Sequence, residues 1–176
     1  GMYLLSIGGR GKVRANLLGS GTILREVQAA AEILERDYGV PADVFSVPSF
    51  RELRREALDC ERWNLLNPNE KARVPYVAQC LSGHEGPFIA ATDYMRTVPD
   101  QVRQWVPGEY VTLGTDGFGR SDARAELRHH FEVDRRFVVL AALKALVDDK
   151  KLDRKTLAKA MADLGIDAAK PNPLIS

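Results

Sequence analysis

Two short segments carry the side chains best suited to specific contacts. ATDYM at 91–95 and LGTDGFGRSD at 113–122 each follow an apolar, β-prone run. In open α/β sheets, binding groups gather where a strand gives way to a helix, beyond the carboxyl ends of the strands. If the two strands are parallel neighbours, one sheet edge collects both segments. The candidate binding or interface residues are two carboxylates, two aromatics and a guanidinium: Asp93, Tyr94, Asp116, Phe118 and Arg120.

Turn chemistry accounts for part of this set. Asp side chains bond to nearby backbone, Gly supplies positive φ, and Ser121 or Asp122 can cap a following helix. Phe118 stands between two glycines and is harder to explain as a bare turn residue. It is either a plug into the core of this domain or an anchor for a neighbour, and the sequence leaves both open.

Other residues with catalytic or metal-binding potential have simpler explanations. His129 and His130 are adjacent, and neighbouring helical side chains point about 100° apart, so they chelate one metal poorly. We expect them near a helix end, where imidazoles can bond the last carbonyls. His84 lies in a glycine-flanked loop and is expected to be solvated. The GSGT turn at 19–22 could offer N–H groups to an anion, but it lacks GxGxxG spacing, and a tight turn is the preferred interpretation.

The composition is typical of one ordinary globular domain. The chain has 176 residues, of which 45% are hydrophobic and 28% charged. A net charge of +1 gives no reason to expect a nucleic-acid or acidic-membrane partner. Two cysteines, Cys60 and Cys80, form no disulfide framework and are interpreted as reduced thiols of a cytoplasmic protein. We expect neither a signal peptide nor a membrane span.

Strand-like and helix-like patterns alternate along the chain. Strands are predicted at 12–18, 43–47, 86–93 and 110–116. Helices are predicted at 22–38, from 49, from 75, around 98–106, from about 121, after 134 and at about 153–164. Strands separated by helices indicate an α/β sheet that is covered on both faces.

Several segments together carry a family resemblance. They are KVRANLLGSGTILREVQAAAEIL near the start, DCERWN at 59–64, RVPYVAQ at 73–79, ATDYM, LGTDGFGRSD, LRHHFEVD at 127–134 and the closing AAKPNPLIS. In these, and in their order, the chain resembles the last domain of the homodimeric bacterial pyruvate dehydrogenase, the thiamine-diphosphate-dependent decarboxylating component. The resemblance implies a transketolase-like C-terminal domain: a three-layer α/β/α sandwich with a five-stranded, mostly parallel sheet and one antiparallel strand. It covers nearly the whole chain, so we expect one domain over 1–176, with 1–11 and 170–176 as loose ends.

The resemblance also implies a function for a longer protein. That protein would decarboxylate pyruvate and acetylate lipoamide, using thiamine diphosphate and Mg²⁺ that the family holds through a GDG motif and asparagines. This chain has no GDG and no Asn-Asn pair. We therefore expect no catalytic, cofactor-binding or metal residue in it, and an inactive isolated chain.

The implied role is structural. The chain would pack on upstream domains of the same protein and contact the second subunit of a homodimer; contact with the dihydrolipoamide acetyltransferase core stays open. Two alternatives remain: the matching domain of another transketolase-like 2-oxo-acid enzyme, or an autonomous α/β module that binds an anion or small molecule.

Overall fold

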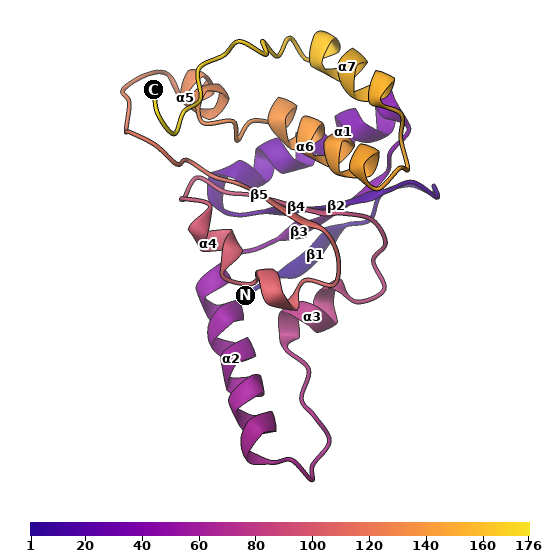
Figure 1. The fold of residues 1–176 in the computed structure, drawn as a ribbon, viewed down its shortest axis with the longest axis vertical. Coiled ribbons are helices and arrows are strands. Elements are labelled where there is room, and N and C mark those ends of the chain that lie inside the picture. The colour runs from indigo at the N-terminus through magenta and orange to yellow at the C-terminus, as the bar shows by residue number, and fades with distance from the viewer.

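A single five-stranded sheet forms the centre of the computed structural model, which describes residues 1–176, and helices cover both of its faces (Figure 1). The strands are β1 (Tyr3–Ser6), β2 (Ala15–Gly19), β3 (Ala42–Ser46), β4 (Phe88–Ala91) and β5 (Tyr110–Leu113). Their order in the sheet is β1-β3-β2-β4-β5. Strands β2 to β5 are parallel, and β1 is antiparallel to β3. The predicted α/β/α sandwich with a five-stranded, mostly parallel mixed sheet is confirmed.

The edge strand β1 corrects one expectation. It lies within 1–11, which we expected to be a loose end, and pairs with β3 from Tyr3↔Ser46 to Ser6↔Val44. All four of its side chains are exposed. Backbone pairing, rather than apolar burial, orders this segment, so side-chain pattern gives no signal for it.

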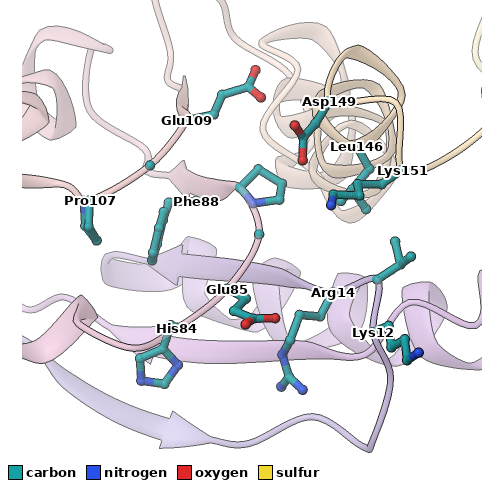
Figure 2. A pocket seen from close by; sticks show the side chains of 14 residues that line it. Lys12, Arg14, His84, Glu85, Phe88, Pro107, Glu109, Leu146, Asp149 and Lys151 are labelled. Carbon is teal, nitrogen blue, oxygen red and sulfur yellow. The ribbon is translucent and has the colours of Figure 1, made fainter.

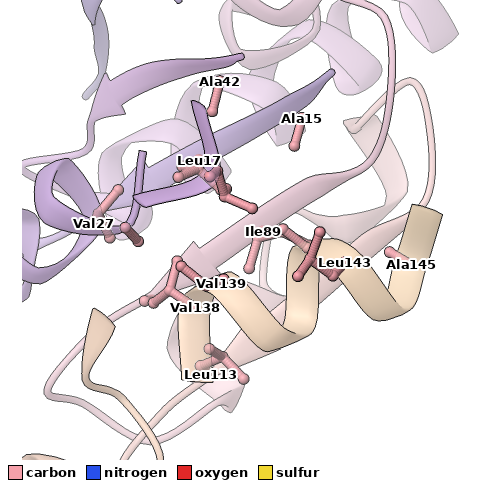
Figure 3. Close-up of a cluster of buried hydrophobic side chains, with 14 of the residues drawn as sticks. Ala15, Leu17, Val27, Ala42, Ile89, Leu113, Val138, Val139, Leu143 and Ala145 are labelled. Carbon is pink, nitrogen blue, oxygen red and sulfur yellow. The ribbon is translucent and has the colours of Figure 1, made fainter. Parts of the chain in front are cut away.

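Three helices cover one face of the sheet: α1 (Leu24–Tyr38), α6 (Arg135–Asp148) and α7 (Arg154–Asp163). In α1 the buried residues Val27, Ala30 and Leu34 recur at helical spacing, and Gly39 ends the helix in the left-handed conformation at φ +64°. The Asp134 side chain caps α6 by accepting hydrogen bonds from two backbone N–H groups. Figure 3 shows the resulting core, in which α6 packs over the strands.

The other face carries α2 (Phe50–Leu66), α3 (Tyr76–Leu81) and α4 (Thr97–Asp100), over a second buried cluster. Ser49 caps α2 by accepting from the backbone N–H of Glu52 at 3.2 Å, as its sequence pattern predicts. The helix predicted around 98–106 is shorter than expected: it divides into α4 and a 3₁₀ turn, Arg103–Trp105.

The outer half of α2 and the loop that follows it extend beyond the sheet (Figure 1). We call residues 61–75 the arm. The Asn64 side chain joins the two limbs of the arm, because it bonds both the N–H and the carbonyl of Arg73, at 2.8 and 2.9 Å. The Arg73 guanidinium lies 4.1 Å from the Trp63 ring centroid, and Leu65 in the last turn of α2 is 79% exposed. The arm is therefore an internally braced projection with an exposed apolar residue near its end.

Candidate functional site

The carboxyl ends of β2, β4 and β5 meet at one edge of the sheet. Because β4 and β5 are parallel neighbours, ATDYM and GTDGFGRSD lie together, and the N–H of Thr115 donates to the carbonyl of Tyr94 at 2.9 Å. That expected juxtaposition is confirmed. From β2 the chain continues to β3, its neighbour on one side, and from β4 it continues to β5, which lies on the opposite side. The direction in which strands are added therefore switches between β2 and β4. Open α/β sheets bind ligands at such a point.

Asp116 has a structural role at this edge. Its carboxylate accepts from the backbone N–H of Arg96 at 2.9 Å and lies 3.7 Å from the Arg96 Nε. The Thr115 hydroxyl donates to the carbonyl of Asp93 at 2.8 Å. These contacts tie the two strand ends together, so bracing between the two loops, rather than a bond to its own turn, is sufficient to explain Asp116.

The structure separates the two interpretations of Phe118. Its side chain is 76% exposed, so it is not a plug into the core of this domain. Tyr94 is 60% exposed, and Met95 beside it is also exposed. An aromatic ring of this kind on a folded loop is typical of a contact residue.

The C-terminal tail passes this loop and is not wholly loose, contrary to our expectation for 170–176. The Lys170 ammonium donates to the carbonyl of His130 at 2.7 Å, and Pro173 is buried. A Cβ on Gly117, whose φ is +113°, would lie 2.0 Å from the Pro173 carbonyl oxygen, so only glycine fits there. Exposed apolar side chains of the two strand ends and the tail form what we call the edge patch: Tyr94, Met95, Phe118, Leu174 and Ile175.

Asp93 and Arg120 line a cavity of about 550 Å³ at the same edge, which we call the strand-end crevice. It lies between the strand ends and the short helix α5 (Arg124–His130). Its charged lining is Asp93, Arg120, Arg124 and Arg128, and its apolar lining is Ile23, Leu127, Phe131 and Val133. Arg124 and Arg128 were not predicted from the sequence. The helix was expected to begin at Ser121, and none of its side chains was expected to face a ligand.

The two adjacent histidines stand at the end of α5 and serve different partners. His130 Nδ1 lies 3.0 Å from the Arg120 guanidinium, and His129 Nδ1 lies 3.3 Å from Asp134. Burial and the nearby charges of Arg120 and Lys170 lower the pKa of His130, which favours the neutral ring that can accept from a guanidinium. Neither ring bonds the last carbonyls of α5 as expected, since Lys170 takes that of His130.

A second cavity, of about 500 Å³, lies at the amino ends of the strands (Figure 2). Charged side chains of both signs line it: Lys12, Arg14, Glu85, Glu109, Asp149 and Lys151. The mixture gives no preference for one charge class of ligand. No group of three or more His, Cys, Asp or Glu side chains is placed to hold a metal ion anywhere in the chain. None of the helices is both long and apolar enough to cross a bilayer.

His84, beside this cavity, is not solvated as expected. Its Nδ1 lies 2.7 Å from Asp43, and its ring packs edge-on against Phe45. Burial acts to raise the pKa of Asp43, but the hydrogen bonds from His84 and the N–H of Gly8, together with Arg14 at 2.6 Å, hold it below its ordinary value. A carboxylate inside the apolar strand 43–47 was the only available sign of this cluster.

Glu26 fixes the wall of the strand-end crevice. Its buried carboxylate accepts from Arg128 at 3.0 Å, from the Arg135 side chain at 2.9 Å and from the Arg135 N–H at 3.1 Å. Burial acts to raise the pKa of Glu26, but the bonds from Arg135 and the charge of Arg128 hold it below its ordinary value. One carboxylate on α1 thereby ties down both α5 and α6.

Glu26→Gln is expected to lower the free energy of unfolding by about 2 kcal/mol at pH 7, since it removes charge-assisted hydrogen bonds from a buried site. The folded-state pKa of Glu26 is lowered, so its contribution is full above the ordinary glutamate pKa of about 4.3 and is lost as pH falls through the folded value. Urea denaturation at several pH values measures both effects. The control is Glu32→Gln, an exposed position on the same helix. A deficit that persists unchanged at pH 3 would contradict the charge argument.

Comparison with known proteins places the chain in a family. The model of the family described as the transketolase-like TK C-terminal domain matches residues 1–134. The chain belongs to this family. It is 57% identical over 176 residues to the pyruvate dehydrogenase E1 component of Pseudomonas aeruginosa, covering 99% of this chain and 20% of that protein. The Escherichia coli K12 pyruvate dehydrogenase E1 component is 54% identical over 179 residues, covering 100% of this chain and 20% of that protein.

These relatives confirm the resemblance expected from the sequence. The chain spans about a fifth of the length of the curated relatives that it matches. Solved structures of transketolases agree on the fold. A Pichia stipitis transketolase complex with xylulose-5-phosphate gives a TM-score of 0.56 at 21% identity, covering 87% of this chain and 19% of that chain. The Campylobacter jejuni transketolase gives 0.52 at 21% identity, covering 82% and 18%.

Proposed function

We propose that this chain is the non-catalytic C-terminal part of a pyruvate dehydrogenase E1 component. The full-length form would decarboxylate pyruvate and acetylate lipoamide, with thiamine diphosphate and Mg²⁺ bound in its upstream part. The observation that carries the proposal is identity of 54–57% along the whole chain to proteins named as this component. The names of these relatives favour pyruvate over another 2-oxo acid. The fraction of their length that the chain matches favours a part of a larger enzyme over an autonomous module.

The residues of this chain do not fit the cofactor. Mg²⁺ bound to a diphosphate needs carboxylate or amide oxygens that converge and are free to bind it. At the strand-end edge, Asp116 is engaged with Arg96, and Asp93 is the one carboxylate in a crevice whose other charges are arginines. Burial raises the pKa of the Cys60 thiol to about 11, so this cysteine is no ready nucleophile. These environments support a structural role.

Two exposed surfaces support contacts with other parts of the enzyme. The edge patch presents Tyr94 and Phe118, and the arm presents Leu65. We propose that this edge faces an upstream domain or the second subunit of a homodimer, with Tyr94 and Phe118 as direct anchors. Of the other interface candidates, Asp116 braces the loop, and Asp93 and Arg120 line the strand-end crevice beside the contact. The dihydrolipoamide acetyltransferase core is a further proposed partner of the full-length protein. The two free thiols accord with a cytoplasmic location.

The isolated chain is expected neither to bind thiamine diphosphate nor to decarboxylate pyruvate. Isothermal titration of the chain with thiamine diphosphate and Mg²⁺ should give only the heat of dilution. The full-length protein, titrated in the same buffer, is the positive control and should give a saturable heat. Saturable binding with micromolar affinity to the chain alone would refute the non-catalytic assignment. A full-length protein that fails to bind the cofactor would refute the family function.

A further inference from the structure

We propose that the strand-end crevice binds a small organic anion, a carboxylate or phosphate group carried on an apolar body. This site goes beyond the structural role argued above. It also differs from the edge patch, because none of the five patch residues lines it, although Gly117 and Gly119 of the same loop do. Three observations support it: its position and size, its unpaired positive charge, and its apolar wall.

The position and size of the crevice are those of a small-molecule site. Thr22 follows β2 and Asp93 follows β4, and both line the crevice, so it opens at the point where the strand order switches. Its volume of about 550 Å³ lies within the roughly 300–1,000 Å³ of pockets that bind small molecules. An elongated protein segment would need a groove, and a bare ion would need far less space.

The charges of the crevice favour an anion. Arg128 is already engaged by Glu26, at 3.0 Å, a carboxylate that it shares with Arg135. Arg120 bonds only Nδ1 of His130, which carries no negative charge. Arg124 makes no ion pair within the chain. The one carboxylate of the lining, Asp93, accepts from the Thr22 hydroxyl at 3.4 Å. Two guanidinium groups therefore remain available, and their planar donor geometry suits a carboxylate or a phosphate.

The remaining wall favours a ligand with an apolar body. Ile23, Phe131 and Val133 are buried core residues along the crevice, 1%, 9% and 0% exposed, and the half-buried Leu127 lies beside them. An inorganic anion on the arginines would leave Leu127 and the exposed edge of Phe131 in contact with water, whereas an aliphatic or aromatic group would cover them.

This wall is also held in place before any ligand arrives. Glu26 fixes Arg128 of α5, and the Lys170 ammonium bonds the carbonyl of His130 at 2.7 Å, at the end of the same helix. A ligand that binds here need not order the helix first, which lowers the entropic cost of binding.

Fluorine NMR of small probes added to the full-length protein tests the proposal. The probes are 4-fluorophenyl phosphate, 4-fluorobenzoate and neutral 4-fluorophenol. We expect saturable line broadening for at least one anionic probe at concentrations up to about 10 mM, and none for 4-fluorophenol. Whichever anion binds more tightly identifies the head group. Excess inorganic phosphate should displace the anionic probe only weakly, because it cannot cover the apolar wall.

Substitutions assign the binding to the crevice. Arg124→Gln and the double variant Arg120→Gln/Arg124→Gln should lower the affinity for the anionic probe by about tenfold or more, since each removes charge-assisted hydrogen bonds. The matched control is Arg51→Gln, an exposed arginine of α2 on the opposite face of the sheet, which should leave the affinity unchanged. Circular dichroism of each variant checks that the fold is retained.

Three outcomes would overturn the proposal: no saturable binding of either anion, equal binding to the wild type and the double variant, or equal binding of 4-fluorophenol. Binding by the 176-residue chain but not by the full-length protein would also overturn it, since the crevice would then be covered by another domain. None of these outcomes bears on the thiamine diphosphate titration, so this proposal and the enzyme assignment can fail separately.

Discussion

Leu34→Ala and Leu143→Ala are each expected to lower the free energy of unfolding by about 2–5 kcal/mol, the range for large-to-small changes in a packed core. Both side chains are 0% exposed and belong to the same cluster on the α1, α6 and α7 face. Helices α1 and α6 pack on each other as well as on the sheet, so a cavity at either site is bordered on several sides and cannot readily collapse. Each loss combines removed apolar burial with an unfilled cavity.

Urea denaturation of the chain measures both changes. The matched control is Leu140→Ala, one turn before Leu143 on the same helix but only partly buried, which should cost clearly less. If Leu34→Ala and Leu143→Ala each lower the free energy of unfolding by less than about 0.5 kcal/mol, this cluster is not the stabilising core.

The contrast between Leu140 and Leu143 shows the limit of predicting the buried face of a helix from the spacing of its apolar residues. In α1, polar residues separate the apolar ones, so a period near 3.6 identifies Val27, Ala30 and Leu34 as the buried face. The helix α6 lies between α1, α7 and the sheet, and FVVLAALKALV is apolar on most sides. Periodicity cannot select one buried face from such a segment, although it identifies the helix.

Elements without a side-chain signature escaped prediction for a related reason. Strand β1 is ordered by backbone pairing with β3, and the tail by Lys170 reaching the carbonyl of His130. These contacts join residues 40 or so positions apart, and no local pattern encodes them. The predicted start of α5 was wrong for a different reason. Asp122 accepts from the N–H of Ala123 instead of capping the helix, which begins at Arg124.

The location of the candidate site could be predicted from the sequence, but the residues that contact one another there could not. Parallel strands put their carboxyl ends on one edge, so the segments that carry Asp93 and Asp116 were expected to lie together if β4 and β5 were parallel neighbours, as they are. Which of these residues line a cavity depends on where α5 packs, and α5 is placed by Glu26, 102 positions from Arg128. The exposed ring of Phe118 likewise required the tertiary structure, because a glycine-flanked aromatic can point inward or outward.

Phe118→Ala combined with Tyr94→Ala is expected to weaken assembly of the full-length protein while leaving this domain folded. The two rings are 76% and 60% exposed, so their loss removes little from the core of the chain. Buried against a second subunit or an upstream domain, each could contribute on the order of 2 kcal/mol as a contact hot spot, or about 30-fold in the dissociation constant. Sedimentation velocity over a concentration series measures the subunit equilibrium.

The matched control is Tyr3→Ala. Tyr3 is 51% exposed on β1, at the sheet edge opposite β5, so its removal deletes an exposed aromatic without touching the edge patch. Circular dichroism and urea denaturation of the 176-residue double variant should match those of the unaltered chain, which separates lost contact from lost folding. If the double variant also leaves the subunit equilibrium and activity of the full-length protein unchanged, the edge patch is no interface. The loop at 114–119 then only braces the neighbouring strand end, as Asp116 does through Arg96.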